Sequence, residues 1–212
     1  ISKEKMLIAE KTATLLSSIP TVSFIGISGS LALHHADADD DIDFFIITKK
    51  HTFWITRLLC LFLLQRYGLR RQYGKKTKAN NVCINMIVSE DKMSFVPSRR
   101  DIYTAREIVQ MRPLFSRDNT YEKFLIANTW TQSLLPNASP RNELKEHTQY
   151  NYRLSVISYK LLEPFAKLFQ IWYMKKHRTV EEVCDGFAAF HPRDYRVETM
   201  KQYERRCKLY KI

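Results

Sequence analysis

The sequence predicts an α+β protein, in which a mixed sheet with helices is followed by an all-helical C-terminal part. Segments rich in β-branched and aromatic residues predict three strands, at 21–28, 41–48 and 81–88. Helical patterns predict helices before and between them, at 3–18, 31–35 and 51–67. Because the two patterns alternate along the chain, we expect one sheet covered by helices.

The pattern changes after about residue 97. The helices expected there cover 100–111, 118–134, 141–182 and 193–210, with prolines between them. Pro164 lies inside the third of these segments, so we expect it to kink or split that helix. The sequence therefore predicts two domains, residues 1–97 and residues 98–212.

The segment 41–48 is expected to be a central strand, because its residues 44–47 are apolar on both faces. A strand places residues i and i+2 on the same face. Asp41 and Asp43 are therefore expected to project side by side, with Ile42 pointing the other way. Two carboxylates at the edge of a buried strand repel each other and lose hydration, so they need a counter-charge. A divalent cation supplies one.

Five aspartates lie between residues 37 and 43, and a calcium loop is the first alternative to consider. Asp37, Asp39 and Asp41 match the opening of such a loop. Its sixth position is Ile42, where the sharp turn needs glycine, and its twelfth is Thr48 instead of glutamate. The sequence does not fit a calcium loop.

A solvated acidic loop and a catalytic metal site are the remaining interpretations of the cluster. A solvated loop suits Asp37, Asp39 and Asp40. It does not suit Asp41 and Asp43, which belong to an apolar strand. For this pair we favour a catalytic metal site.

The Gly29-Ser30 pair is expected to form the turn between the first strand and a short helix. Backbone N–H groups in such a turn can bind an anion. The turn is no Walker loop, because no Gly-Lys-Ser/Thr follows it. It is no dinucleotide fingerprint either, because the whole chain has only five glycines. A metal site and an anion site together indicate nucleotide chemistry.

A net charge of +12 indicates either a device for solubility or a polyanionic partner such as nucleic acid. The four cysteines form no CxxC pair, which argues against zinc and against a disulfide framework. We expect reduced thiols, a cytoplasmic location and no association with membranes. Because residue 1 is isoleucine, we expect the chain to be trimmed from a longer one.

The order Gly29-Ser30, ten residues, then Asp41-Ile42-Asp43 between two strands resembles the signature of the DNA polymerase beta-like nucleotidyltransferase superfamily. The expected order of strands and helices extends the likeness to about residue 90. The chain is also similar to small bacterial nucleotidyltransferase-domain proteins, whose helical C-terminal part ends in a segment like Phe190-His191-Pro192. The resemblance implies a nucleotidyltransferase domain at residues 1–97 that moves a nucleoside monophosphate from an NTP to a hydroxyl and releases pyrophosphate.

The resemblance also implies roles for particular residues. Asp41 and Asp43 would be catalytic and would hold two magnesium ions, or manganese in their place. Gly29 and Ser30 would bind the nucleotide triphosphate. A third carboxylate often lies on a later strand in this superfamily, and Asn85 stands at the matching place. An amide oxygen can ligate magnesium but brings no charge. Asn85 is therefore a candidate metal ligand, or a polar neighbour of the site, and Glu90 is an alternative third ligand.

Three hypotheses for the acceptor stay open. The first is a 3′ end of RNA or DNA, which the basic charge favours. The second is a small molecule or a protein, as in antibiotic adenylylation or AMPylation. The third is a degenerate module that binds a nucleotide without transferring it, which Asn85 would suit. The candidate nucleic-acid-binding residues lie between the second long helix and the third strand: Arg66, Arg70, Arg71, Lys75, Lys76 and Lys78.

Overall fold

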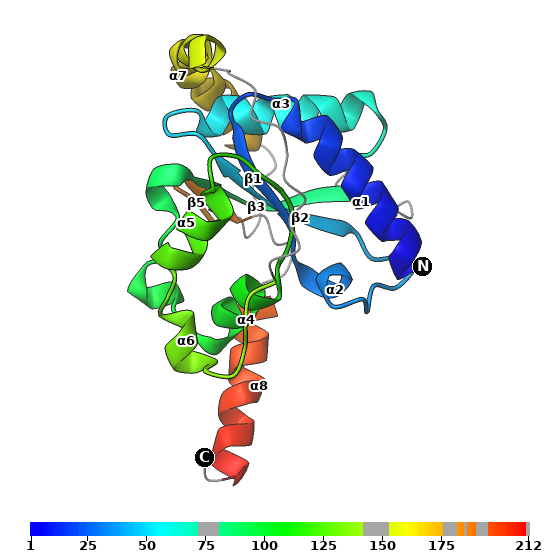
Figure 1. Ribbon diagram of the computed structural model, residues 1–212, viewed down its shortest axis with the longest axis vertical. Coiled ribbons are helices and arrows are strands. Elements are labelled where there is room, and N and C mark those ends of the chain that lie inside the picture. The colour runs from blue at the N-terminus through cyan, green and yellow to red at the C-terminus, as the bar shows by residue number, and fades with distance from the viewer. Residues whose placement is uncertain (72–80, 142–152, 176–181, 185, 190–194, 211–212) are drawn as a thin grey trace.

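The computed structural model describes residues 1–71, 81–141, 153–175, 182–184, 186–189 and 195–210. The strands within these ranges are β1 (Val22–Ile27), β2 (Ile42–Thr48), β3 (Val82–Ser89), β4 (Arg112–Ser116), β5 (Glu182–Cys184) and β6 (Phe187–Ala189). The α-helices are α1 (Ser2–Ser17), α2 (Gly29–Ala32), α3 (Phe53–Arg66), α4 (Ile102–Gln110), α5 (Thr120–Ala127), α6 (Thr131–Leu134), α7 (Arg153–Lys175) and α8 (Tyr195–Tyr210). The described strands form one sheet in the order β4-β1-β2-β3-β6-β5, with helices around it (Figure 1).

The sheet is mixed, which confirms the predicted α+β class. β2 runs antiparallel to β1 and parallel to β3, so it has a neighbour on each side. The other pairs, β1 with β4, β3 with β6 and β5 with β6, are antiparallel. As expected, the most apolar strand is an interior one.

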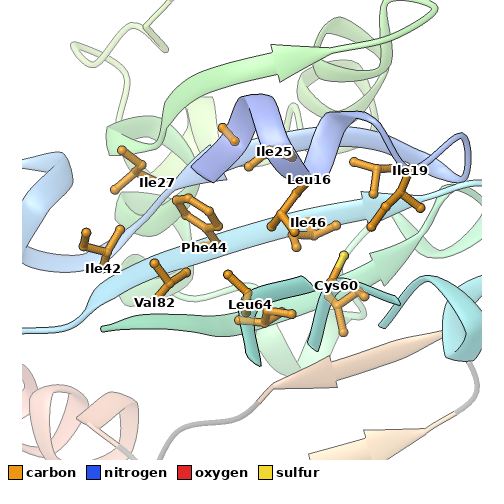
Figure 2. Packing of buried hydrophobic residues seen from close by; sticks show 14 of the residues in the cluster. Leu16, Ile19, Ile25, Ile27, Ile42, Phe44, Ile46, Cys60, Leu64 and Val82 are labelled. Carbon is orange, nitrogen blue, oxygen red and sulfur yellow. The ribbon is translucent and has the colours of Figure 1, made fainter. Parts of the chain in front are cut away.

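Both faces of the sheet carry a hydrophobic core, because β2 is apolar on both of its faces. Phe44 and Ile46 belong to the core beneath α1 and α3, where they lie near Leu16 and Leu64 (Figure 2). Phe45 belongs to the opposite core, which α4 and α5 complete. The alternation of side chains along a strand produces this division.

The N-terminus of α3 is capped by a residue of α7. Thr52, at the N-cap position, makes no side-chain capping bond. Instead, the Glu163 carboxylate accepts hydrogen bonds from the backbone N–H groups of Trp54 and Ile55, at 2.8 Å and 2.9 Å. The first turn of a helix has unpaired N–H groups and a partial positive charge, so a carboxylate stabilises it. This contact ties α7 to α3.

The C-terminal part differs from the all-helical expectation, because β4, β5 and β6 come from it. β4 contains Pro113, which the sequence pattern predicts only as a break between helices. A proline is tolerated at an edge strand, and β4 is the edge strand beside β1. The sheet therefore spans the expected boundary after residue 97, and the division into two domains stays a prediction.

Two helices also differ from the expectation. The segment 118–134 forms two helices, α5 and α6, instead of one. The described part of α7, Arg153–Lys175, continues through Pro164 as one helix, so of the expected kink or split at that proline the split is wrong. No helix in the described ranges is both long enough and apolar enough to cross a bilayer.

Candidate functional site

The acidic pair lies where the central strand begins. Asp41 directly precedes β2 and Asp43 is its second residue, while Ile42 between them is fully buried on the other side. Their carboxylates are close enough for the charge of Asp41 to raise the pKa of Asp43. This effect is compatible with the side-by-side arrangement expected from the spacing i, i+2.

The Gly29 backbone lies against the carboxylate of Asp43. Gly29 has φ +68°, in the left-handed region, and a Cβ atom built on it would lie 2.8 Å from Asp43 Oδ2. Two features therefore favour glycine at position 29: the left-handed backbone conformation and the lack of space for a Cβ atom. The structure thus brings together the Gly-Ser turn and the acidic pair, which are twelve residues apart in the chain.

Ser30 and the acidic loop are held by their own hydrogen bonds. Ser30 Oγ donates to Asp40 Oδ2 at 2.7 Å, and the Asp37 backbone N–H donates to the same oxygen at 3.1 Å. Lys5 Nζ donates to the carbonyl oxygens of Ala38, at 3.0 Å, and of Asp40. Lys5 is 1% exposed, so α1 delivers a buried cation beneath the loop.

Arg71 supplies the direct counter-charge to Asp41. Arg71 Nη1 lies 2.7 Å from Asp41 Oδ2, and the Asp41 side chain is only 10% exposed. The other carboxylate oxygen, Asp41 Oδ1, is buried and has no hydrogen-bond partner within the described part of the chain. A buried carboxylate oxygen without a partner is costly, so this atom is available to a cation.

The predicted nucleic-acid-binding cations do not form one group in the structure. Arg66 is exposed at the end of α3, and Arg70 is half-buried beside Val82 of β3. Arg71 points to the acidic pair instead of into solvent. The remaining three, Lys75, Lys76 and Lys78, lie outside the described residues, and contact with nucleic acid stays a prediction for all six.

Burial and neighbouring charge both favour the neutral form of Asp43. Burial raises the pKa of Asp43, the charges of Asp41, Glu107 and Asp40 raise it further, and Arg71 opposes them, for a value of about 7. Burial also raises the pKa of Asp41, although Arg71 and Lys5 counteract this. Ionisation of the pair is therefore unfavourable in free energy, and a bound cation would stabilise the ionised form.

Glu107 of α4 belongs to the site, and the sequence interpretation missed it. Burial raises the pKa of Glu107, and the nearby Gly29 backbone N–H counteracts this rise. A signal was present. Thr104, Glu107, Ile108 and Met111 follow the spacing i, i+3, i+4, i+7 of a buried helix face, where a glutamate is unusual.

Asn85 is buried beside the site at an irregularity of β3. The pairing of β2 with β3 skips Asn85, passing from Phe44–Ile84 to Phe45–Met86. The Asn85 amide donates to Ser28 Oγ at 3.4 Å. Ser28, Asn85 and Glu107 are among the residues that line a cavity of about 90 Å³ between the sheet and α4. Ligation of metal by Asn85 stays a prediction.

Glu90 is not the third ligand, because it lies at the opposite end of the sheet from the acidic pair. β3 pairs with β2 in parallel from Cys83 beside Asp43 to Ser89 beside Thr48, and Glu90 follows Ser89. There it accepts hydrogen bonds from Ser23 Oγ at 2.6 Å and Lys49 Nζ at 3.0 Å. Across the described ranges, no three His, Cys, Asp or Glu side chains are grouped to hold a metal ion. Among the described carboxylates, the candidate metal ligands are Asp41 and Asp43.

Comparisons with known proteins leave the family open. No protein-family model matches the chain, and no curated protein matches it. A crystal structure of a toxin–antitoxin with AMP-PNP is 17% identical, with 60% of this chain and 86% of that chain covered and a TM-score of 0.36. A mutant of the toxin–antitoxin MntA-HpeT is 16% identical over the same shares, with a TM-score of 0.35. These TM-scores are too low to assign function by likeness, so the chemistry must come from the residues of the site.

Proposed function

We propose that this chain is a metal-dependent nucleotidyltransferase that moves a nucleoside monophosphate from an NTP to an acceptor hydroxyl and releases pyrophosphate. The contact of Gly29 with Asp43 is the observation that carries the proposal. It joins a turn with backbone N–H groups to a pair of acidic residues at the start of a central strand. A triphosphate with bound metal ions needs these two kinds of group next to each other.

The acidic pair has the properties of a metal site. Asp41 Oδ1 is buried without a partner among the described residues, and the raised pKa of Asp43 reflects a carboxylate that lacks compensation. Carboxylate oxygens are the ligands that magnesium prefers. Asp41 and Asp43 would hold magnesium or manganese, with the Asn85 amide as a further candidate. The bound metal would neutralise phosphate charge and stabilise the attacking and leaving oxygens.

The turn at Gly29 and Ser30 would bind the phosphates of the NTP. The Gly29 N–H group lowers the pKa of the nearby Glu107 carboxylate, so this N–H already faces an anionic group. A phosphate oxygen bound there would compete with Glu107 for the same N–H group. Ser30 Oγ is bonded to Asp40, so its backbone N–H is the group offered to the phosphates.

The acceptor we propose is the 3′ end of a nucleic acid. The net charge of +12 supports a polyanionic acceptor. Arg66 and Arg70 remain candidates for phosphate contacts, whereas the ion pair with Asp41 gives Arg71 a second role, in balancing the charge of the site. A small-molecule or protein acceptor is the alternative.

Incubation of the full chain with each α-labelled NTP, magnesium or manganese, and RNA and DNA oligonucleotides tests the proposal. We expect label in the oligonucleotide together with released pyrophosphate, and none with oligonucleotides that lack a 3′-hydroxyl. Label in protein or in an added small molecule would replace nucleic acid as the acceptor. Binding of NTP without transfer to any acceptor would contradict the proposed nucleotidyltransferase activity and support a degenerate nucleotide-binding module.

A further inference from the structure

α7 has a buried face and a face that is apolar but exposed. The first packs along α3 at the periphery of the molecule, with Ala166, Gln170 and Met174 buried (Figure 1). The second carries a stripe of large apolar side chains. Their exposed fractions are 73% for Leu161, 70% for Phe165, 69% for Leu168 and 71% for Trp172.

The stripe has the spacing of a seam between two helices. Its members follow one another at steps of four, three and four residues, which keeps them on one line along a helix. Exposed apolar side chains also flank the line on both sides: Ile157, Leu162, Phe169 and Ile171. Ser158 and Lys175 continue the line at its two ends, so the apolar seam is bounded by a hydroxyl and a cation.

The exposed area is too large for an isolated surface and large enough for a stable dimer. Eight large apolar side chains are involved, most of them at least half exposed. Since an aromatic side chain buries about 150–250 Å² when covered, the eight together offer on the order of 1,000 Å². A standard protein interface buries about 800 Å² per partner, whereas the largest apolar patch of a typical monomer is about 300–600 Å².

We infer that α7 pairs with α7 of a second copy of this chain, antiparallel about a twofold axis. An axis near Ala166 and Lys167 would place Phe165 opposite Leu168 of the other copy. The same axis would place each Trp172 opposite a Leu161 and each Lys175 opposite a Ser158, so every aromatic residue of the line meets a leucine. The seam is thus complementary to itself, as a twofold interface must be.

Other arrangements fit the face less well. A parallel pair would set Trp172 against Trp172 and Lys175 against Lys175. A helix that lies on an anionic membrane needs a strongly basic polar face. In α7 the face opposite the stripe packs against α3. Among the α7 residues whose side chains the structure describes, Lys160 and Lys175 are the only charged ones that are exposed.

The mass of the full chain in solution, measured by sedimentation over a range of concentrations, tests the inference. We expect a dimer for the parent. Phe165→Asp and, in a second variant, Leu168→Asp should weaken the dimer by about a hundredfold or more, since each buries a charge at the centre of the seam. Ile126→Asp is the matched control, because Ile126 of α5 is equally exposed, at 71%, and lies outside the seam.

A circular dichroism spectrum like that of the parent and a cooperative melting transition would show that each variant folds as a monomer. A parent that stays monomeric at high micromolar concentration would overturn the inference. So would a folded Phe165→Asp protein that dimerises as tightly as the parent and the Ile126→Asp control.

Engineered cysteines test the orientation. Leu161→Cys and Trp172→Cys proteins, mixed and oxidised, should form a disulfide between the two variants that neither forms alone and that the parent lacks. Disulfides in each variant alone, and none between the two in the mixture, would exclude the antiparallel pair.

Discussion

Asp43 is the aspartate of the candidate site whose pKa is raised most strongly. Burial raises its pKa, and three carboxylates add to the effect, those of Asp41, Glu107 and Asp40. Arg71 alone opposes them among the groups that shift this pKa. A protein that keeps such a residue at the start of a central strand loses stability when the carboxyl ionises, and a bound metal ion would reverse that loss.

The first prediction concerns pH and metal-free protein. An aspartate in an unfolded chain has a pKa of about 3.9, and Asp43 in the folded protein has a pKa of about 7. Between these values the folded protein keeps a proton that the unfolded chain has lost, so this residue lowers stability as pH rises to about 7 and adds no further change above it. Asp43→Asn should remove this fall, leaving the metal-free variant more stable than the parent above pH 7, by at most a few kcal/mol.

Denaturant unfolding with a chelator present, at several pH values, measures the difference between the two proteins. The difference should vanish below about pH 3, where Asp43 is protonated in both the folded and the unfolded protein. If the free energy of unfolding changes with pH in the same way for the parent and the variant, Asp43 has an ordinary pKa.

The second prediction separates the two reasons for glycine at position 29. Gly29→Ala should lose about 1–2 kcal/mol from its positive φ and should also weaken NTP binding, because its Cβ meets Asp43. Gly68→Ala is the matched control, since Gly68 has φ +67° and nothing within 4 Å of its Cβ position. Thermal melting and calorimetric titration with NTP and magnesium check both proteins. Equal NTP affinity in the two variants would mean that the contact with Asp43 does not concern the nucleotide.

At this scale, the sequence identified the residues whose position follows from local spacing. Gly29, Asp41 and Asp43 are fixed by a turn and by the alternation of a strand. Lys5, Arg71 and Glu107 come from three other segments, and only the packing of those segments brings them to the pair. For Lys5 and Arg71, no local pattern distinguishes the residue from the many exposed cations of the chain.

At the scale of the elements, the contact of α7 with α3 is the one that sequence patterns could least predict. Glu163 caps a helix that starts more than one hundred residues earlier in the chain. The long, strongly apolar segments were predicted well, because their own residues determine their conformation. β4 and β6 are short, and pairing with β1 and β3 determines them instead.

The third prediction tests this cap. Glu163→Ala should lower the free energy of unfolding by about 1–3 kcal/mol, because two N–H groups of α3 lose a charged acceptor. Lys160→Ala, one turn away on the exposed side of α7, should change it by less than about 0.5 kcal/mol. Denaturant unfolding measures both. A Glu163→Ala protein as stable as the control would mean that solvent satisfies these N–H groups equally well.

At the scale of the whole molecule, the net charge of +12 is the property that bears most on the acceptor. The fourth prediction is that Arg66→Gln, Lys75→Gln and Lys78→Gln together lower affinity for short RNA or DNA. The slope of log affinity against log salt should flatten by roughly 0.7–0.9 for each phosphate that the variant no longer neutralises. Arg71 is left unchanged, because it pairs with Asp41.

The control carries the same three charge changes on α8, at Lys201, Arg205 and Lys208, which lie together on that helix. Gel shifts at several salt concentrations give both slopes. If the α8 variant loses the salt dependence and the first variant keeps it, nucleic acid binds at α8 and not at the cations of the segment 66–78.

The rate of nucleotidyl transfer by Asp43→Asn, relative to Asp39→Asn, tests the central claim most directly. Both variants remove one aspartate charge from the same region, but Asp39 is exposed in the acidic loop whereas Asp43 lies against Gly29. We expect Asp39→Asn to transfer label at nearly the parent rate and Asp43→Asn to be slower by at least about a thousandfold, equivalent to about 4 kcal/mol in the barrier. Transfer by a folded Asp43→Asn protein at the rate of the Asp39→Asn control would contradict the assignment of this site as the catalytic centre.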